Sequence, residues 1–222
     1  MSTYGQFCPI AKAVEVVGGR WTLLLVRELM QGSRRFGELQ RGLSHMSPAL
    51  LTKRLRELEA AGLVLRIRGA RQKGCDYALT QAGRELSPAV VELARWGMKW
   101  VRSTMERDDL DIDLLMLDIQ RSIRRDLLPA SRVVVKIQFT EQRKHGNWWL
   151  ILDQNAIDVC TADPGYAIAV HLTTTVADLA HYWMGDIDWR SARRARRITL
   201  TGQPGLVREL PTWLGRSSAA AM

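Results

Sequence analysis

The sequence contains few of the residues from which covalent or metal-bound frameworks are built. Its 222 residues include only three cysteines, which lie far apart at Cys8, Cys75 and Cys160. An odd number of widely spaced cysteines excludes a disulfide framework and a CxxC metal or redox pair, and is typical of a reducing compartment. The four histidines have no metal-ligand spacing either. We therefore expect no bound metal.

The motifs of the common enzyme classes are also missing. The sequence has no GxSxG elbow, no Walker loop, no GxGxxG fingerprint and no HExxH motif. These motifs position a nucleophile, a phosphate, a dinucleotide or a zinc ion. We therefore expect a protein that is not an enzyme and that needs no cofactor.

Long apolar runs are absent as well. No window approaches the ~18 uninterrupted apolar residues of a membrane-spanning helix, and the N-terminus lacks the basic head and apolar stretch of a secretory signal. We expect a cytoplasmic protein with no membrane partner.

The charge is unevenly distributed along the chain. The formal net charge is +9 at pH 7. Up to Arg107 there are 18 Lys and Arg against 9 Asp and Glu, whereas the remainder holds 14 of each. Basic residues on one half of a chain are typical of contact with a polyanion, because they displace counterions from phosphates. The first half is therefore expected to meet nucleic acid.

A break in the apolar rhythm divides the chain near residue 108. The stretch MERDDLDID turns acidic and loses its periodicity, as a linker or helix junction does. With 46% hydrophobic residues the chain can bury a core on each side of it. We expect two domains, residues 1–107 and 108–222, in an α+β protein.

The first domain alternates helical patterns with one hairpin. Apolar residues at helical spacing, with proline and serine starts and glycine stops, predict four helices within residues 8–19, 21–32, 36–43 and 48–62. Two short strands, 63–68 and 75–80, flank the basic tip GARQKG, and a last helix begins at Ser87-Pro88. Three helices, a capped longer helix and a basic hairpin predict a winged helix-turn-helix domain that binds duplex DNA.

Candidate DNA contacts follow from the helix of residues 48–62. Its leucines at 51, 55 and 58 form the inward stripe, so the outward residues should reach the major groove. Arginines before the third helix should hold phosphates, and the hairpin should contact the backbone or minor groove. The candidate residues are Ser47, Thr52, Lys53 and Arg56 for the groove, Arg34 and Arg35 for phosphates, and Arg68, Arg71 and Lys73 for the wing. The alternative is that these charges only form a solvated face.

The last helix of this domain has a wider apolar band than a small core needs. Leu93, Trp96, Trp100 and Val101 extend it. We expect this surface, with the first helix, to be buried in a two-fold homodimer.

Several motifs in this half resemble the HxlR-type transcriptional regulators. The Cys-Pro start, Gly-Gly-Arg-Trp, Arg-Arg-Phe-x-Glu-Leu and Leu-Thr-x-Arg-Leu-x-Glu-Leu occur in order between residues 8 and 101. The resemblance implies a dimeric winged-helix regulator on a double-stranded DNA operator. It also implies a possible thiol switch at Cys8, where the helix N-terminus and Lys12 favour a thiolate. The tip GARQKG is shorter than in many relatives, which leaves the groove contacts of the wing open.

The second domain is predicted to be α+β. A helix within residues 113–129 precedes a meander of about four strands, at 132–139, 147–152, 156–161 and 166–172. A short helix capped by Thr175 and Asp178 and ended by Gly185 follows. An arginine-rich turn, expected to be a solvated face paired with Asp186 and Asp188, leads to the strand RITL and a terminal helix at 204–215.

The order of these elements and the closing ~40 residues resemble a sterol-carrier-protein-like domain, which some HxlR-type regulators append. The resemblance implies an apolar tunnel for a lipid-like or aromatic small molecule. The candidate ligand residues are Trp148, Trp149, Trp183, Met184, Trp189 and Trp213. Alternatively, these side chains are ordinary core.

Together these features predict a homodimeric, DNA-binding repressor whose C-terminal domain binds an apolar effector. Two alternatives stay open at this point: a hydrophobe or lipid carrier with a basic scaffold domain, and a thiol-based redox regulator that acts through Cys8.

Overall fold

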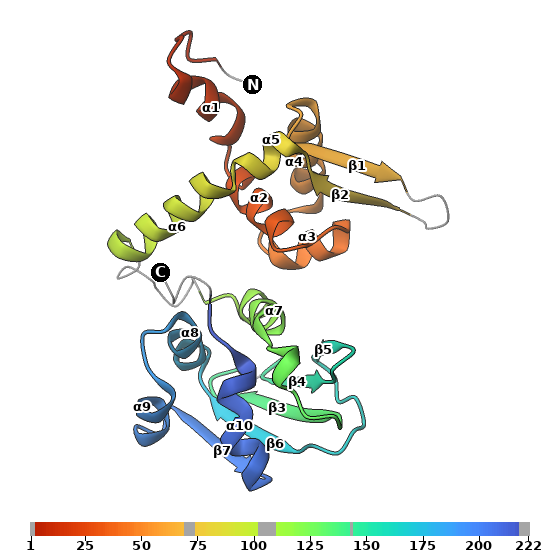
Figure 1. Ribbon diagram of the computed structural model, residues 1–222, viewed down its shortest axis with the longest axis vertical. Helices are drawn as coiled ribbons and strands as arrows, with labels where there is room; N and C mark the ends of the chain where they lie inside the picture. The colour runs from red at the N-terminus through yellow and green to blue at the C-terminus, as the bar shows by residue number, and fades with distance from the viewer. Residues whose placement is uncertain (1–2, 69–73, 102–109, 143, 218–222) are drawn as a thin grey trace. The chain divides into compact units, whose positions relative to one another are not determined.

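The computed structural model describes residues 3–68, 74–101, 110–142 and 144–217 (Figure 1). The chain divides into two compact units, residues 1–102 and 103–222. The first unit consists of helices and a two-stranded hairpin, and the second contains a five-stranded sheet with helices. Within the described ranges, no helix is long and apolar enough to cross a membrane.

The first unit has the architecture of a winged helix-turn-helix. Its elements are α1 (Pro9–Val17), α2 (Thr22–Met30), α3 (Phe36–Gly42), α4 (Pro48–Ala60), β1 (Val64–Arg68), β2 (Cys75–Leu79), α5 (Gln81–Glu85) and α6 (Ser87–Trp100). The four predicted helices, the hairpin and the last helix are confirmed. The short helix α5 was not predicted, because five residues are too few to show a helical period. Its start is fixed by Thr80, whose hydroxyl accepts a hydrogen bond from the Gly83 N–H at 3.0 Å.

Helix α4 is held by caps at its start and by a leucine stripe along its length. Ser47 is the N-cap, and its hydroxyl accepts a hydrogen bond from Leu50 N–H at 3.3 Å. Leu51, Leu55 and Leu58 are almost fully buried in one cluster with residues of α2 and α3. Burial of a leucine contributes roughly 1.5–3 kcal/mol, so this stripe determines which side of α4 faces outward.

The hairpin extends beyond the core that supports its base. Val64 pairs with Leu79 and both are buried, but Leu65 and Ile67 are 53% and 48% exposed. The predicted alternation of apolar residues along β1 therefore does not correspond to an inward face. Beyond Val64, β1 is exposed, whereas β2 keeps contact with the helices: the Tyr77 side chain packs against their core, and its N–H donates to Arg34 O at 2.7 Å.

The buried carboxylate of Glu28 links α2 to the residues around α3. Glu28 is fully buried, and its carboxylate accepts from Arg27 Nη2 at 2.7 Å and from Ser33 Oγ at 3.3 Å. Gly42 lies directly against this carboxylate, since a Cβ at that position would be 2.0 Å from Glu28 Oε2. A buried carboxylate is tolerated only with such partners, so the absence of a side chain at Gly42 preserves the pair.

The second unit is an α+β layer structure. Its elements are α7 (Ile112–Ser122), the 3-10 turn η3 (Arg125–Leu127), β3 (Val133–Phe139), β4 (Asn147–Leu152), β5 (Ile157–Cys160), β6 (Val170–Thr174), α8 (Val176–Met184), α9 (Trp189–Arg194), β7 (Ile198–Gly202) and α10 (Pro204–Leu214). The caps predicted for α8 are confirmed: Thr175 accepts from Asp178 N–H, and Gly185 ends the helix with a φ of 86°. The helix predicted within 113–129 is shorter, and Leu127 lies exposed in η3 instead of extending the apolar stripe.

The predicted meander is confirmed for its first three strands, since β3, β4 and β5 are consecutive antiparallel neighbours, and wrong for the fourth. The sheet order is β5-β4-β3-β6-β7, and β6 runs parallel to β3. The chain therefore crosses from the edge strand β5, over β4 and β3, before β6 begins at Val170. Apolar alternation shows that a segment is a strand but does not specify its neighbour, which is why the order could not be predicted.

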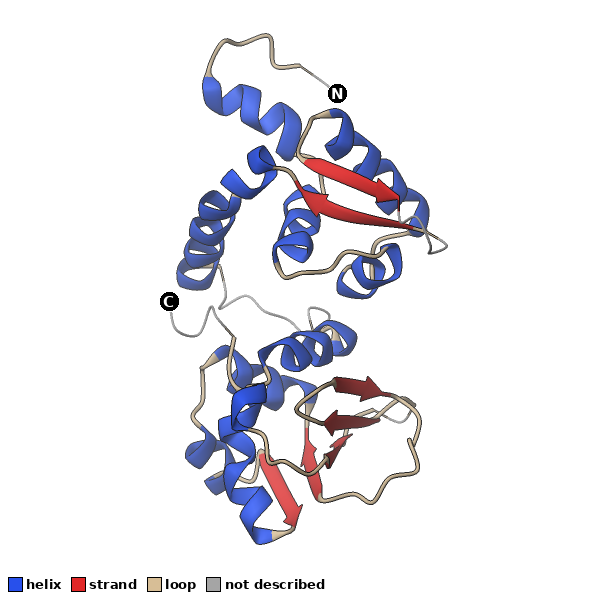
Figure 2. Cartoon of the chain, turned by 45° about the vertical axis from the view of Figure 1, so that its right-hand side comes forward, coloured by secondary structure: helices blue, strands red, loops and turns tan. Residues whose placement is uncertain are grey.

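The two faces of this sheet differ. Val133, Val135, Ile137 and Phe139 point to one side, as predicted, and join the large core formed with α7, α8, α9 and α10. Figure 2 shows these helices gathered on one side of the strands. Val134, Trp149 and Ile151 form a smaller cluster on the other face. The main core, and any apolar ligand site within it, therefore lies between the sheet and the helices.

The close approach at Gly42 leads to a stability prediction. We expect Gly42→Ala to lower the free energy of unfolding by about 1–3 kcal/mol, because the methyl group must displace the buried Glu28 carboxylate. Gly37→Ala, in the same helix with nothing within 4 Å of the added Cβ, should be neutral or raise it by up to about 1 kcal/mol. Urea unfolding with hydrogen exchange of residues 22–30 measures both. Equal effects of the two substitutions would contradict the role given to Gly42.

Candidate nucleic-acid interface

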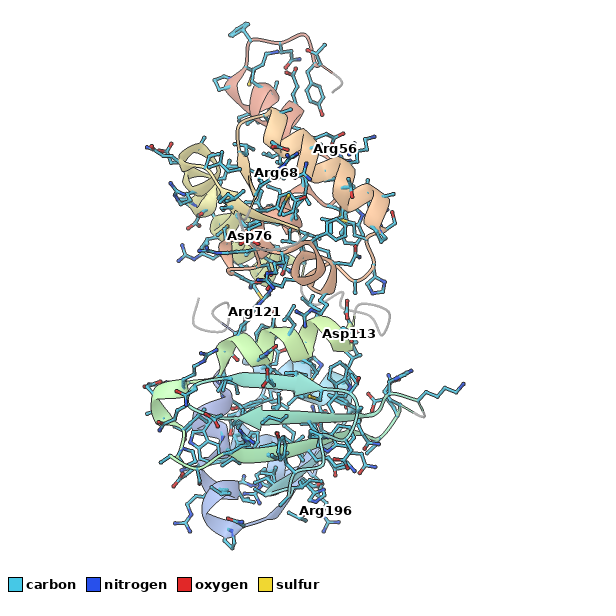
Figure 3. All side chains as sticks on the ribbon, turned by 90° about the vertical axis from the view of Figure 1, so that its right-hand side faces the viewer. Arg56, Arg68, Asp76, Asp113, Arg121 and Arg196 are labelled. Carbon is cyan, nitrogen blue, oxygen red and sulfur yellow. The ribbon has the colours of Figure 1, made fainter. Side chains whose placement is uncertain are left out.

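The outward face of α4 carries two long cations. Lys53 and Arg56 are exposed, and Figure 3 marks Arg56 on this helix. The Lys53 ammonium lies 4.0 Å from Glu57, a loose contact for a side chain that is 68% exposed. Exposed ion pairs of this kind contribute about 1 kcal/mol or less, so Lys53 can exchange its partner for a phosphate or a base edge at little cost.

The two smaller residues predicted for the groove already form hydrogen bonds with the backbone of α4. Ser47 caps α4, and Thr52 is half-buried with its hydroxyl donating to Pro48 O at 2.9 Å. Both hydroxyls therefore already have backbone partners. A contact of either hydroxyl with DNA would have to form beside its existing backbone hydrogen bond.

Arg34 and Arg35 lie exposed where α3 begins. Their backbone N–H groups donate to Glu38 Oε2 at 2.8 and 3.0 Å, and the Arg35 guanidinium lies 3.9 Å from Asp76. Burial opposes ionisation of Glu38, but these N–H groups, with the charges of Arg35 and Arg41, outweigh it and hold its pKa below the usual value. The ionised Glu38 keeps the start of α3, and with it both arginines, in place.

The described part of the wing presents arginines along β1. Arg68 is exposed at the end of the strand, whereas Arg71 and Lys73 lie outside the described residues. Arg66 is two residues from Arg68, so both share one face of the strand. Hydrogen bonding and charge interaction with Cys75 raise the pKa of Arg66. Arg66 was not among the predicted contacts, although its spacing of two residues from Arg68 in a predicted strand already indicated that both lie on one face.

Helices α1 and α6 have no buried residue. In α6 the exposed set agrees with the sequence-based expectation, with Trp96 56% and Trp100 64% exposed. At the N-terminus, Phe7 is 99% and Ile10 73% exposed. Large apolar side chains in this number are rarely left in water by a monomer, so both helices offer an association surface.

The structure does not bring the six candidate ligand residues together. Trp148 and Trp149 are neighbours on β4 and point to opposite faces of the sheet. Trp213 is fully buried in the main core. Only Trp183, Met184 and Trp189 are half-buried; Trp183 Nε1 donates to Ser122 Oγ at 3.3 Å, and Trp189 packs edge-on against Tyr182 at 4.9 Å.

The arginine-rich segment around α9 is exposed, but its pairing differs from the prediction. Arg197 lies 3.7 Å from Asp178. Asp186 instead lies 2.8 Å from His181 Nδ1, and Asp188 caps α9 by accepting from Ser191. Asp188 sits at the start of α9, where its carboxylate is closer to free N–H groups than to arginines one or two turns further on.

Cys8 occupies the N-cap position of α1 and is half-buried. The Lys12 ammonium, expected to assist its thiolate, lies 3.1 Å from Glu15. A carboxylate therefore already engages this cation. In the described part of the chain, no group of three His, Cys, Asp or Glu side chains could hold a metal ion.

Comparison with known proteins identifies the family of the first unit. The family model described as HxlR-like helix-turn-helix matches residues 16–105. The chain is 36% identical over 98 residues to the uncharacterized HTH-type transcriptional regulator YvaP of Bacillus subtilis, covering 43% of this chain and 91% of YvaP. It is 34% identical over 112 residues to the HTH-type regulator sll1512 of Synechocystis, covering 50% of this chain and 80% of that protein.

Among solved structures, the redox regulator HypR in its oxidized form is 36% identical, with a TM-score of 0.39. The match covers 41% of this chain and 96% of HypR. The region that the family model matches contains α4, the hairpin and α6. The match to YvaP spans 91% of that protein at 36% identity. The chain therefore belongs to the HxlR-like helix-turn-helix family of DNA-binding transcriptional regulators.

Proposed function

We propose that this chain is a homodimeric cytoplasmic repressor, in which α4 reads the operator and the C-terminal unit binds an apolar effector. The observation that carries the proposal is the exposure of Lys53 and Arg56 directly opposite the buried leucine stripe of a capped helix. Arginine and lysine contacts to guanine edges are the commonest specific contacts in a major groove.

The remaining cations would position the protein rather than select the sequence. Arg34, Arg35 and Arg68 are exposed, and the Arg35 guanidinium lies 3.9 Å from Asp76, which pairs with Ile67 next to Arg68 in the hairpin. Figure 3 labels both Arg68 and Asp76 in the first unit. Contacts of these arginines to phosphates carry no base information but fix the register of the recognition helix. We include Arg71 and Lys73 of the wing in this group, on the sequence alone.

A second copy of the chain is the proposed occupant of the apolar surface on α1 and α6. A two-fold dimer would bury this surface and present two copies of α4 to half-sites about one DNA turn apart. Bound in this way, the dimer covers an operator and blocks transcription, which is why we propose a repressor.

The C-terminal unit is proposed to be a sterol-carrier-protein-like sensor. Its helices cover one face of the sheet, and half-buried apolar residues surround the junction of α8, α9, β7 and α10: Trp183, Ile187, Trp189, Leu200, Leu206 and Val207. Apolar side chains at the margin of a core can separate to admit a ligand with less loss of packing than central ones. We therefore retain Trp183, Met184 and Trp189 as ligand residues, with Trp213 and Trp148 in the core beneath, and exclude Trp149 from the site.

The recognition helix is tested by removing its two exposed cations. Lys53→Ala and Arg56→Ala should each weaken operator binding by about 1–3 kcal/mol, because each removes a charged donor from the groove. The operator is found by genomic footprinting, and affinity is measured by fluorescence anisotropy at fixed salt. Arg193→Ala with Arg194→Ala removes the same charge from the second unit and should have little effect. Unchanged operator affinity in a folded Lys53/Arg56 double variant rules out this role.

The dimer is tested by charging its proposed interface. Trp96→Glu with Trp100→Glu should yield monomers at micromolar concentration, because two carboxylates would otherwise be buried against apolar surface. Light scattering measures the mass. Leu127→Glu, at an exposed apolar residue of the second unit, serves as the control and should leave the dimer intact. A wild-type protein that is monomeric and still binds a palindromic site with full affinity is inconsistent with the proposal.

The effector site is tested with a panel of fatty acids, sterols and apolar aromatic compounds. We expect a binder by calorimetry, weakened by Trp189→Ala but not by Trp149→Phe on the opposite face of the sheet. A bound effector should change operator affinity roughly 5- to 150-fold, corresponding to ~1–3 kcal/mol of coupling. A compound that saturates the C-terminal unit and leaves operator affinity unchanged would make this unit a carrier or a dimerisation platform instead.

A further inference from the structure

A pocket of about 340 Å³ lies in the first unit, behind the recognition helix. It is lined by Tyr4 before α1, by the second half of α1, by the Gly18-Gly19 turn, by Thr22, and by Lys53, Arg54, Glu57 and Leu58 of α4. This volume is at the small end of the range for small-molecule sites. Neither the family match nor the proposed effector site in the second unit accounts for it.

The acids of this pocket are already engaged. Glu15 accepts from Tyr4 N–H at 2.7 Å and from Thr3 Oγ at 2.9 Å, and it lies 3.1 Å from the Lys12 ammonium. The Tyr4 N–H, then Lys12 and Thr3, hold the pKa of Glu15 below its usual value. Glu15 therefore stays ionised at neutral pH, and its hydrogen bonds go to Thr3, Tyr4 and Lys12.

The cations of the pocket share a single carboxylate. Glu57 lies 2.5 Å from Arg54 Nη1 and 4.0 Å from Lys53 Nζ. The Arg54 Nε atom is buried and donates no hydrogen bond. A buried N–H without a partner costs roughly 1–3 kcal/mol, so Glu57 does not satisfy the whole Arg54 guanidinium.

Gly19 holds the Arg54 guanidinium against the turn before α2. A Cβ at Gly19 would lie 2.9 Å from Arg54 Nη1, so the two groups are in close contact. The apolar side chains in the lining are Val14, Val16 and Leu58. The pocket thus combines a positioned guanidinium, an exposed ammonium and several apolar side chains.

We propose that this pocket binds a small organic carboxylate, held by Arg54 and Lys53, with its apolar body against Val14, Val16 and Leu58. A guanidinium binds a carboxylate through paired, charge-assisted hydrogen bonds. Because Lys53 is also a proposed DNA contact, the bound carboxylate withdraws its ammonium from the groove and lowers operator affinity. This regulatory consequence depends on the proposed function, whereas binding of the carboxylate does not.

The test titrates the full chain with phenylacetate, its neutral analogue phenylacetamide, and inorganic phosphate, by calorimetry and without DNA. We expect saturable phenylacetate binding with one site per chain, and much weaker binding of the other two. Arg54→Gln should weaken phenylacetate binding about ten- to a hundredfold, because a charged hydrogen-bond donor is lost. Arg41→Gln, at an exposed arginine of α3, should not. Lys53→Gln, at a solvent-exposed side chain, gives a second variant whose folding is not at risk and should weaken phenylacetate about fivefold or more.

Three outcomes overturn the site. No saturable phenylacetate binding up to about 10 mM excludes it at any useful affinity. If phenylacetamide binds equally well, the cations do not select the ligand. If phosphate binds equally well, the pocket selects an anion and not an organic carboxylate.

The regulatory consequence has a separate test. Saturating phenylacetate should weaken operator binding roughly 5- to 150-fold. Unchanged operator affinity at saturation overturns the withdrawal of Lys53. If Lys53→Ala and Arg56→Ala leave operator binding unchanged while the wild-type chain still binds phenylacetate, the proposed DNA contacts of α4 are wrong and the proposed carboxylate pocket is retained.

Discussion

Burial of Leu51, Leu55 and Leu58 is the interaction on which the functional surfaces of the first unit depend. A helix repeats every 3.6 residues, so once these leucines face α2 and α3, the directions of all other α4 side chains are determined. Lys53 and Arg56 then point outward, and Arg54 lies at the boundary, where it meets Glu57 and the Gly18-Gly19 turn. The proposed groove contacts and the proposed carboxylate pocket thus lie on adjacent sides of one helix. A change that rotated α4 would alter both.

The two units differ in the type of partner they suit. The first carries the whole excess of positive charge, and its exposed arginines and lysines can neutralise phosphates. The second is balanced in charge and holds a large apolar core on one face of its sheet. An apolar effector in that core can act on DNA binding only if it favours one state of the protein over the other. A ligand beside α4 would need no such relay, because it would engage a side chain that is itself a proposed DNA contact.

The first unit leaves more apolar surface exposed than its own core requires. Helices α1 and α6 contribute no buried residue, although both have a pronounced apolar side. By contrast, α2 and α4 bury several residues each. Helices α1 and α6 contact the core only through half-buried residues such as Val16, Val17 and Val90, and their exposed apolar side chains are the reason for proposing the dimer through them.

The sequence by itself determined the local elements with strong end signals: α4 through Ser47 and Pro48, α8 through Thr175 and Gly185, and the hairpin through its alternation and glycines. It also determined the outward face of α4, because a period of 3.6 follows from sequence alone. The order of the sheet, with β6 parallel to β3, was decided by the tertiary structure, since periodicity does not select the neighbour of a strand. The separation of Trp148 from Trp149 follows instead from the alternation of side chains along a strand, which places adjacent residues on opposite faces. The burial of Glu28 against Gly42 and the contact of Arg54 with Gly19 join residues far apart in sequence, and only packing in three dimensions brings them together.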